Sequence, residues 1–485
     1  MQSIPISIKH APAYSLGPLP HGIATLIFAV LAVCLSVDSA LSDDKSDKCS
    51  AANIVLILAD DLGWADLGCY GNTFHQTPNL DRMAAEGMRF TQAYAASSVC
   101  SPTRSSIMSG KYPARNDLTV WLGGRTPPGR KLLHAPTVNH LALEEVTIAE
   151  ALRAAGYATG HVGKWHLGGE PYWPERQGFD VNVAGNHTGT PAGGYFLPNR
   201  MNLPGAKPGD YLTDRLGDEA AKFIAANRDR PFFLYQAFHS VHTPIQGKKD
   251  LVESYKRRMK PGQANFNPTY AAMVHSLDEN VGKIIGKLDE FELSERTAVF
   301  FFSDNGGFHR VTSNKPLRAG KGYSYEGGHR EPLIVRMPGR IRPGSVCRTP
   351  VSSVDFYPTI LELTGTPGDR KHNQQSDGVS IVSLLDQSGT VERDAIYWHY
   401  PHYSPQGGTP SGAILAGDFK LIEFFEDGHL ELYNLKEDIA EKNNLAEALP
   451  EKTRELHQML LAWRNKMDAK MPAPNPGYGK KRGGQ

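Results

Sequence analysis

The stretch that decides the fold reads Asn53-Ile54-Val55-Leu56-Ile57-Leu58-Ala59-Asp60-Asp61. Its uninterrupted apolar run is typical of a strand that is buried on both faces. A second run of this kind covers residues 297–302, and shorter runs cover 157–162 and 231–237. Helical patterns lie between the runs, and parallel neighbours need such crossover connections. The strands are therefore expected to pair mostly in parallel.

Helices are predicted between these strands by capping signals and apolar spacing. Thr147 and Glu150 form the pattern of a capping box at the start of a helix over residues 146–156. Apolar residues at helical spacing predict further helices over 218–227 and 270–291. The alternation predicts an α/β domain over residues 52–390, with a large mixed, mostly parallel sheet sandwiched by helices.

The pattern changes in the last hundred or so residues of the chain. Short alternating runs at 413–415, 419–422 and 430–433 precede an amphipathic segment over 453–467. They predict a small antiparallel sheet with a packed helix, within a subdomain over 391–471. Residues 472–485 are rich in Pro, Gly and basic residues and are expected to form a flexible tail.

The N-terminal region has the pattern of an export signal. Its apolar run at 22–37 is shorter than the roughly 20 residues of a transmembrane helix. Ala40 and Ser42 suit a cleavage site, so residues 1–42 are interpreted as a signal peptide and 43–51 as a linker. We expect export to the periplasm or another extracytoplasmic compartment, with an uncleaved membrane anchor as the alternative.

Composition limits the classes of partner. The chain has 52 Lys and Arg against 51 Asp and Glu, a net charge of +1, with 40% hydrophobic residues. This composition is typical of a globular protein. It argues against a protein that coats nucleic acid, because such proteins carry a large excess of basic residues. The Cys count of 5 is too low for a disulfide framework. Cys69 and Cys347 are expected to be free, packed thiols, and Cys49 to be exposed.

Carboxylates follow the two most apolar strands. Asp60 and Asp61 come after the first, and Asp304 and Asn305 after the run at 297–302. Ligands of open α/β sheets bind beyond the carboxyl ends of the strands. Oxygen donors gathered there favour a hard cation such as Ca²⁺ or Mg²⁺. The alternative is that these residues only cap helices and form turns.

Cations and a cysteine complete the candidate site. Lys164 and His166 follow the strand at 157–162, and His239 and His242 follow the one at 231–237, which favours an oxyanion site. Cys100 precedes Pro102 at an expected helix start, a position that lowers a thiol pKa. A nucleophilic cysteine with His partners is one interpretation, and a buried inert cysteine is the other.

The segment around Cys100 resembles the first signature of the formylglycine sulfatases, a branch of the alkaline phosphatase superfamily. Cys100, Pro102 and Arg104 match its Cys-x-Pro-x-Arg core, and residues 156–166 match the second signature. The resemblance spans roughly residues 52–450 and is closest in character to the arylsulfatase A and N-acetylgalactosamine-6-sulfatase branch. It continues through Asp60-Asp61, His242-Thr243-Pro244, Asp304-Asn305-Gly306, Gly320-Lys321-Gly322-Tyr323 and residues 325–332.

The resemblance implies a maturation step and a metal. Cys100 would be oxidised by a formylglycine-generating enzyme to an aldehyde, whose hydrate supplies the nucleophilic hydroxyl. One Ca²⁺, or Mg²⁺, would be held by the modified residue and four others. These four are Asp60, Asp61, Asp304 and Asn305.

The same resemblance implies roles for the basic residues. Arg104 and Lys164 would orient the hydrate, and His166 would take a proton when sulfate is eliminated. His242 and Lys321 would hold the sulfate, either of them protonating the leaving oxygen. The expected activity is hydrolysis of sulfate esters of carbohydrates or aryl sulfates.

Two other functions remain open from the sequence. One is hydrolysis of phosphodiesters or phosphonate monoesters at the same site, and the other is non-catalytic binding of sulfated glycans. A few residues of long loops are candidates for the wall of the substrate pocket. They are Trp121, Arg125, Asn186, His187 and Tyr403.

Overall fold

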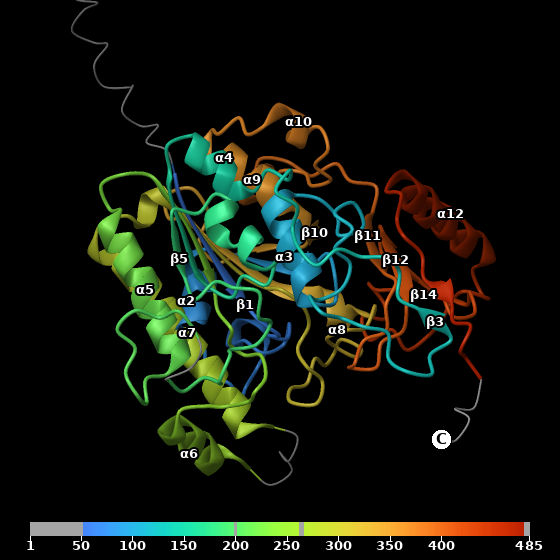
Figure 1. Cartoon of the computed structure of the whole chain (residues 1–485), viewed down its shortest axis with the longest axis horizontal. Helices are drawn as coiled ribbons and strands as arrows, with labels where there is room; N and C mark the ends of the chain where they lie inside the picture. The colour runs from blue at the N-terminus through green and yellow to red at the C-terminus, as the bar shows by residue number, and fades with distance from the viewer. Residues whose placement is uncertain (1–51, 198–200, 261–265, 480–485) are drawn as a thin grey trace, which may run out of the picture. The chain divides into compact units, whose positions relative to one another are not determined.

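The computed structural model describes residues 52–197, 201–260 and 266–479 (Figure 1). Its main feature is a 9-stranded sheet in the order β10-β2-β8-β7-β1-β6-β4-β5, with β9 paired to β2. The strands are β1 Asn53–Ala59, β2 Met88–Tyr94, β4 Ala158–Gly163, β5 Val181–Val183, β6 Phe232–Ala237, β7 Thr297–Ser303, β8 Arg330–Arg336, β9 Ser345–Cys347 and β10 Val351–Ser352.

The sheet is mixed but mostly parallel, as predicted. β1 lies at its centre and pairs in parallel with both β6 and β7. β8 is antiparallel to its neighbours β7 and β2. Every residue of β1, β6 and β7 is buried, which explains why their sequences are apolar without alternation. The carboxyl ends of β1, β4, β6 and β7 therefore meet at one edge.

Helices cover both faces of the sheet, and each face has its own apolar core. One core includes side chains of α3 Cys100–Ser109, α4 Ile148–Ala154 and α9 Phe356–Thr364. The other includes α2 Pro78–Glu86, α5 Leu212–Ala226 and α7 Pro268–Glu290, which Figure 1 shows on the opposite side. The predicted capping box of α4 is confirmed, because Thr147 and Glu150 bond each other's backbone.

A separate four-stranded antiparallel sheet follows, in the order β11-β12-β13-β14. Its strands are β11 Ile396–Tyr400, β12 Ser411–Ala416, β13 Phe419–Phe424 and β14 Leu430–Asn434. Helix α12, Pro450–Lys466, buries Leu456, Leu460 and Trp463 against it. The sheet and the helix are confirmed, and β11 is a strand that the sequence analysis did not predict.

The tail differs in part from the expectation of flexibility. β15, Ala473–Pro474, pairs with β3, Leu132–Leu133, and the backbone N–H of Asn475 donates to the Lys131 carbonyl at 2.8 Å. These backbone bonds fix the start of the tail, because a short Pro-containing segment can still form an edge strand. Residues 480–485 lie outside the described part of the chain.

Several shorter elements complete the fold. They are α6 Lys249–Arg258, α8 Glu326–His329, α10 Arg370–Asn373 and α11 Val382–Leu385. Cys69 and Cys347 are free and half-buried, as predicted. The predicted signal peptide, linker and Cys49 lie outside the described residues, and within the described ranges no helix is long and apolar enough to cross a membrane.

Candidate active site

Four polar side chains converge where β1 and β7 end. Asp60 and Asp61 follow β1, Asp304 and Asn305 follow β7, and all of them are buried. The Asn305 side-chain amide donates to Asp61 Oδ1 at 2.8 Å, and the backbone N–H of Asp61 donates to Asp304 Oδ1 at 3.3 Å. The parallel pairing of the two strands brings these residues together.

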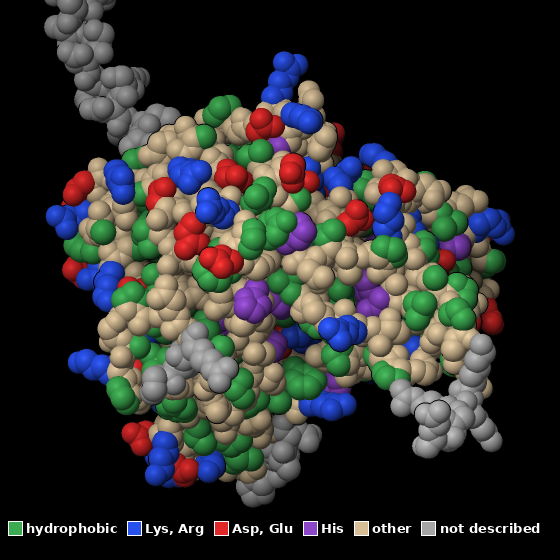
Figure 2. All heavy atoms as spheres, in the orientation of Figure 1, with side chains coloured by type: hydrophobic (Ala, Val, Ile, Leu, Met, Phe, Trp, Pro, Cys, Tyr) green, Lys and Arg blue, Asp and Glu red, His purple; other side chains and the backbone are tan. Residues whose placement is uncertain are grey.

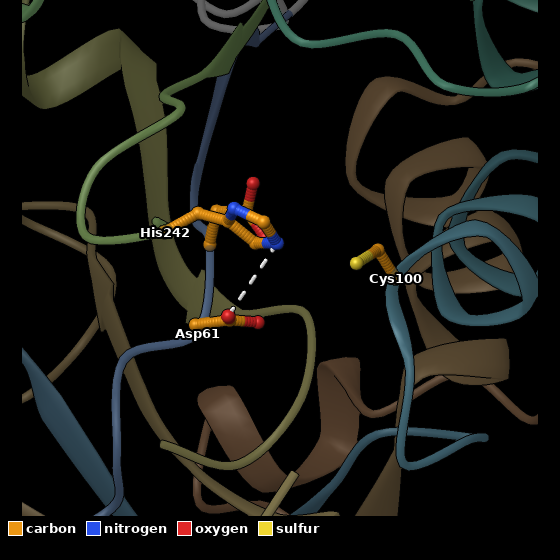
Figure 3. Close-up of side chains that lie close together, drawn as sticks. Asp61, Cys100 and His242 are labelled. Carbon is orange, nitrogen blue, oxygen red and sulfur yellow. Dashed lines mark ion pairs between the residues drawn. The ribbon is translucent and has the colours of Figure 1, made fainter. Parts of the chain in front are cut away.

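Cys100 is the first residue of α3, a helix whose residues are all buried. Its Sγ lies 3.6 Å from Lys321 Nζ, and Figure 3 shows the sulfur pointing toward Asp61 and His242. The expectation of a lowered thiol pKa is wrong. Burial raises the pKa of Cys100 to about 11, outweighing the attraction of Lys164 and Lys321. An unmodified thiol here is protonated and a poor nucleophile.

Each carboxylate of the site has a basic partner. Lys164 Nζ lies 2.6 Å from Asp60 Oδ2, and Lys321 Nζ lies 2.6 Å from Asp61 Oδ1. Arg104 donates from Nε to Asp304 Oδ2 at 2.9 Å and from Nη1 to the Lys164 carbonyl at 2.9 Å. Buried charges require such pairing, and the pairing fixes the positions of Arg104 and Lys164.

The residues present fit a divalent cation. Ligand atoms of Asp60, Asp61, Cys100 and His242 all lie within 4.8 Å of one another. Asp60 Oδ1 and Asn305 Oδ1 are buried, and among the described residues neither has a hydrogen-bond partner. Unsatisfied buried oxygens are costly unless a ligand completes them. His242 was not predicted to belong to this group of ligand atoms.

Asp304 is placed differently from the other predicted ligands. Its Oδ2 accepts from Arg104 and its Oδ1 from the backbone of Asp61, and it does not belong to the compact group of ligand atoms. In this structure both of its carboxylate oxygens therefore have protein partners.

The two strand-end carboxylates titrate in opposite directions. Burial raises the pKa of Asp60 to about 7, despite the nearby Lys164. For Asp61, burial opposes ionisation, but Lys321 and His242 outweigh it and lower the pKa to about 2. A cation bound beside Asp60 would favour its charged form.

The histidines of the site are neutral near pH 7. Burial, together with Lys321, lowers the pKa of His242 to about 3, and burial with Lys164 lowers that of His166 well below its usual value. His242 Nδ1 lies 2.8 Å from the Thr243 carbonyl, which orients Nε2 toward Asp61 at 3.6 Å. His166 Nδ1 is buried and has no hydrogen-bond partner among the described residues.

These groups line a cavity of about 300 Å³. Cys100, His166, His242 and Lys321 form its reactive wall, and Figure 2 shows histidines around a hollow near the centre of this face. His239 is buried and is not part of this wall.

Of the predicted loop residues, Trp121 lines the cavity. Arg125, Asn186, His187 and Tyr403 are not among its lining residues, and the Tyr403 hydroxyl contacts Glu426 instead. Sequence analysis missed several wall residues, because no motif marks them. They are Val99, Leu122, Gly189, Thr190, Pro405 and Gln406.

The sequence match to known families agrees with this geometry. Residues 52–366 match the Sulfatase family model, which covers more than half of the chain. The chain belongs to the sulfatase family. Residues 319–467 of this sulfatase also match a model described as N-sulphoglucosamine sulphohydrolase, C-terminal. The resemblance inferred from the motifs is therefore confirmed.

Curated relatives carry related names. A sulfatase of Formosa agariphila is 34% identical over 89% of this chain and 90% of its own length. Arylsulfatase A of Homo sapiens is 34% identical over 84% of this chain and 87% of its own. N-acetylgalactosamine-6-sulfatase of Canis lupus familiaris is 35% identical over 71% of this chain and 68% of its own.

Solved structures confirm the fold. Ps i-CgsB is 29% identical, with a TM-score of 0.72 over 85% of this chain and 93% of its own. It has also been solved in complex with k-i-k-neocarrahexaose. A phosphonate monoester hydrolase of Agrobacterium radiobacter, at 18% identity and a TM-score of 0.62 over 86% of this chain and 96% of its own, shares the fold alone.

Proposed function

We propose that this sulfatase hydrolyses sulfate esters of carbohydrates or aryl sulfates at a formylglycine derived from Cys100. The observation that carries the proposal is the position of Cys100, which is buried at the cavity wall 3.6 Å from Lys321 and belongs to the compact group of possible metal-ligand atoms. Because burial keeps its thiol protonated, the side chain needs conversion before it can act as a nucleophile. The converted residue supplies a hydroxyl that attacks sulfur.

The metal site of this proposal uses oxygen donors. Asp60, Asp61 and Asn305 would hold one Ca²⁺, with Asp304 and the modified Cys100 completing the site. Such donors suit a hard cation, and Mg²⁺ is the alternative ion. The cation lowers the pKa of a coordinated hydroxyl and neutralises sulfate oxygens.

The basic residues have separable roles in the proposal. Lys321 and His242 lie next to different carboxylate oxygens of Asp61 and line the cavity, so they would bind sulfate oxygens. One of them would protonate the leaving oxygen. Lys321, whose pKa is raised by Asp61 and Cys100 against burial, is the more readily protonated of the two.

Arg104, Lys164 and His166 would act on the converted residue. Arg104 and Lys164 hold the carboxylates in place and would orient its hydroxyls. His166 is neutral, buried and has an unpartnered Nδ1, so it would accept the proton that is released when sulfate leaves.

The cavity also bears on the substrate. At about 300 Å³ it lies at the lower end of small-molecule sites, which favours one sulfated ring or aryl group at a time. The relatives include proteins named arylsulfatase A and N-acetylgalactosamine-6-sulfatase, so both substrate types have support. Export of the chain, and maturation by a formylglycine-generating enzyme, complete the proposal.

Release of 4-nitrophenol from 4-nitrophenyl sulfate tests the function. The protein is produced together with a formylglycine-generating enzyme, and Cys100→Ala is compared with Cys347→Ala, a half-buried cysteine outside the site. We expect Cys100→Ala to lose activity by a factor on the order of 10³ or more. Cys347→Ala should retain it.

Parallel assays separate the alternatives. Faster hydrolysis of phenyl phosphonate monoesters than of sulfate esters would replace the proposal with the phosphonate function. Binding of sulfated oligosaccharides without turnover by the mature protein would replace it with the non-catalytic function. A panel of defined sulfated sugars then identifies the preferred ring and position.

A further inference from the structure

A second, larger concavity lies beside the loop that connects β7 to α8, the gold loop next to α8 in Figure 1. It has a volume of about 1080 Å³. Arg310, Lys315, Arg318 and Lys442 line it together with His309, and its described lining contains no Asp or Glu. We refer to it as the basic groove. A concavity of one charge sign concentrates ligands of the opposite sign.

The cations of the basic groove are largely uncompensated. Arg310, Lys315 and Lys442 are exposed, and within the described ranges their side chains form no ion pair. Arg318 is anchored by Tyr433 Oη at 2.9 Å and by the Glu441 carbonyl at 2.7 Å. Its nearest carboxylate oxygen, on Glu431, is 4.0 Å away. The groove therefore presents free positive charge.

The loop that carries three of these cations, Arg310, Lys315 and Arg318, is held in place. Asn314 is buried and donates to the carbonyls of Gly307 and Ala319, both at 2.9 Å. Thr312 donates to the buried Asp66 at 2.6 Å. A fixed loop positions its charges before a ligand arrives, which lowers the entropy cost of binding.

One aromatic residue, Tyr323, contacts both a residue of the groove and a residue of the active-site cavity. The ring of Tyr323 contacts that of His309 at 5.7 Å on the groove side. Its hydroxyl donates to the Gln406 carbonyl at 2.9 Å, and Gln406 lines the cavity. Arg318 and Lys321 lie in the same loop, one lining the groove and the other the cavity.

We propose that the basic groove binds the anionic chain of a sulfated glycan whose terminal sulfate ester occupies the cavity. The inference rests on the proposed function and extends it, because it makes the physiological ligand a polysulfated chain rather than an isolated small ester. A glycan is favoured over another polyanion because residues of one loop line both the groove and the cavity in which a sulfate ester would react. Arg310, Lys315 and Lys442 would meet sulfate groups beyond the reacting unit.

Inhibition of 4-nitrophenyl sulfate hydrolysis by dextran sulfate tests the groove. The matured enzyme is compared with the triple variant Arg310→Ala/Lys315→Ala/Lys442→Ala, which leaves the anchored Arg318 in place. The control triple variant Arg370→Ala/Lys371→Ala/Arg454→Ala removes the same charge from exposed positions outside the groove. Inorganic sulfate serves as the second inhibitor, because so small an anion competes with the substrate in the cavity without spanning the groove.

The groove variant should raise the inhibition constant for dextran sulfate by roughly tenfold and make its salt dependence shallower, because fewer counterions are exchanged. Its kcat/KM for the aryl sulfate and its inhibition by inorganic sulfate should stay within about twofold of wild type, as exposed charges contribute little at a distance. The control triple variant should match wild type in both inhibition constants.

An unchanged inhibition constant for dextran sulfate in the groove variant would overturn the proposal that the basic groove binds the glycan chain. An equal rise of this constant in the control variant would overturn it as well. Failure of the proposed function is a different result, namely no aryl-sulfate hydrolysis by the matured wild-type protein. In that case calorimetric titration of dextran sulfate into the same three proteins measures the groove directly. Single-stranded DNA of equal charge binding more tightly than dextran sulfate would also overturn the assignment to a glycan.

Discussion

Lys164 Nζ lies 2.6 Å from Asp60 Oδ2, and both side chains are completely buried. The pair holds a carboxylate at the carboxyl end of β1, where burial outweighs the attraction of Lys164 and raises the pKa of Asp60 to about 7. Because Asp60 Oδ1 has no partner in the described structure, Lys164 and a bound cation would share the compensation of this carboxylate.

Substitution of Lys164 should therefore make stability depend strongly on the metal. Lys164→Met removes the nearer basic partner of a buried carboxylate and leaves only the longer contact to Arg104 at 3.9 Å, at a cost of about 3–5 kcal/mol of unfolding free energy in chelator. Added Ca²⁺ should restore part of this loss, and aryl-sulfate hydrolysis should remain at least tenfold below wild type. Urea unfolding with EDTA or Ca²⁺ measures the effect, with the exposed Lys371→Met as control. Equal losses with and without Ca²⁺ would contradict the shared compensation.

Gly189 controls the space around His166. A Cβ at this glycine would lie 2.6 Å from His166 Cε1, so Gly189→Ala must displace the ring. We expect kcat for 4-nitrophenyl sulfate to fall by about tenfold or more, with the Ca²⁺-dependent thermal shift unchanged. Gly169→Ala is the matched control, because nothing lies within 4 Å of its added carbon. A kcat equal to that of wild type in Gly189→Ala would contradict a catalytic role for His166.

His161 should contribute to acid sensitivity. Burial lowers its pKa from 6.5 to about 3, while Asn182 opposes the shift. Between these values the unfolded chain binds the additional proton, so stability is present above about pH 6.5 and is lost as the pH falls. The loss from this group reaches about 2 kcal/mol by pH 5.

His161→Phe should therefore make the urea midpoint less dependent on pH. The ring packs edge-on against Trp165, Phe179 and Tyr235, a setting that suits an aromatic replacement. Midpoints are compared at pH 5 and pH 7.5 for both proteins. An identical change between the two pH values in wild type and variant would show that His161 does not titrate on unfolding.

Lys420 links the antiparallel sheet to the α8 region. Its Nζ lies 2.9 Å from Glu326 and 3.4 Å from Glu441, and all three side chains are fully buried. Lys420→Met should cost about 3–5 kcal/mol of unfolding free energy, because Glu441 loses its buried basic partner while Glu326 retains Arg330 at 3.2 Å. Lys420→Met/Glu441→Gln should recover part of that loss. Chemical denaturation of the three proteins measures both effects, and an unaffected single variant would show that the charges are not energetically paired.

The strands that could be predicted are those that are buried on both faces and also almost entirely apolar. β1 and β7 meet both conditions, so their ends, and with them Asp60 and Asp304, could be located from sequence. β8 is equally buried but has charged residues at both of its ends, and it was not predicted. β2 is only partly buried and β11 is short, and neither was predicted. The prediction of a lowered thiol pKa at Cys100 was wrong, because the sequence around Pro102 indicates where the helix begins but not that the whole helix is buried.

The wall of the cavity was the least predictable part of the site. Gly189 and Gln406 belong to loops that are far apart in sequence, and no sequence motif or spacing marks either residue as part of a pocket. The basic groove could not be predicted from the net charge of the chain either. A total of +1 sums over the whole chain, whereas Arg310, Lys315 and Lys442 meet only in the folded protein.

The mass of the peptide containing Cys100, taken from the same preparation that is assayed, tests the central claim most directly. Conversion of the cysteine to formylglycine lowers the mass by about 18 Da. We predict that specific activity toward 4-nitrophenyl sulfate rises in proportion to the converted fraction and extrapolates to zero for the unconverted thiol. Full activity in a preparation whose Cys100 peptide has the unmodified mass would contradict the account.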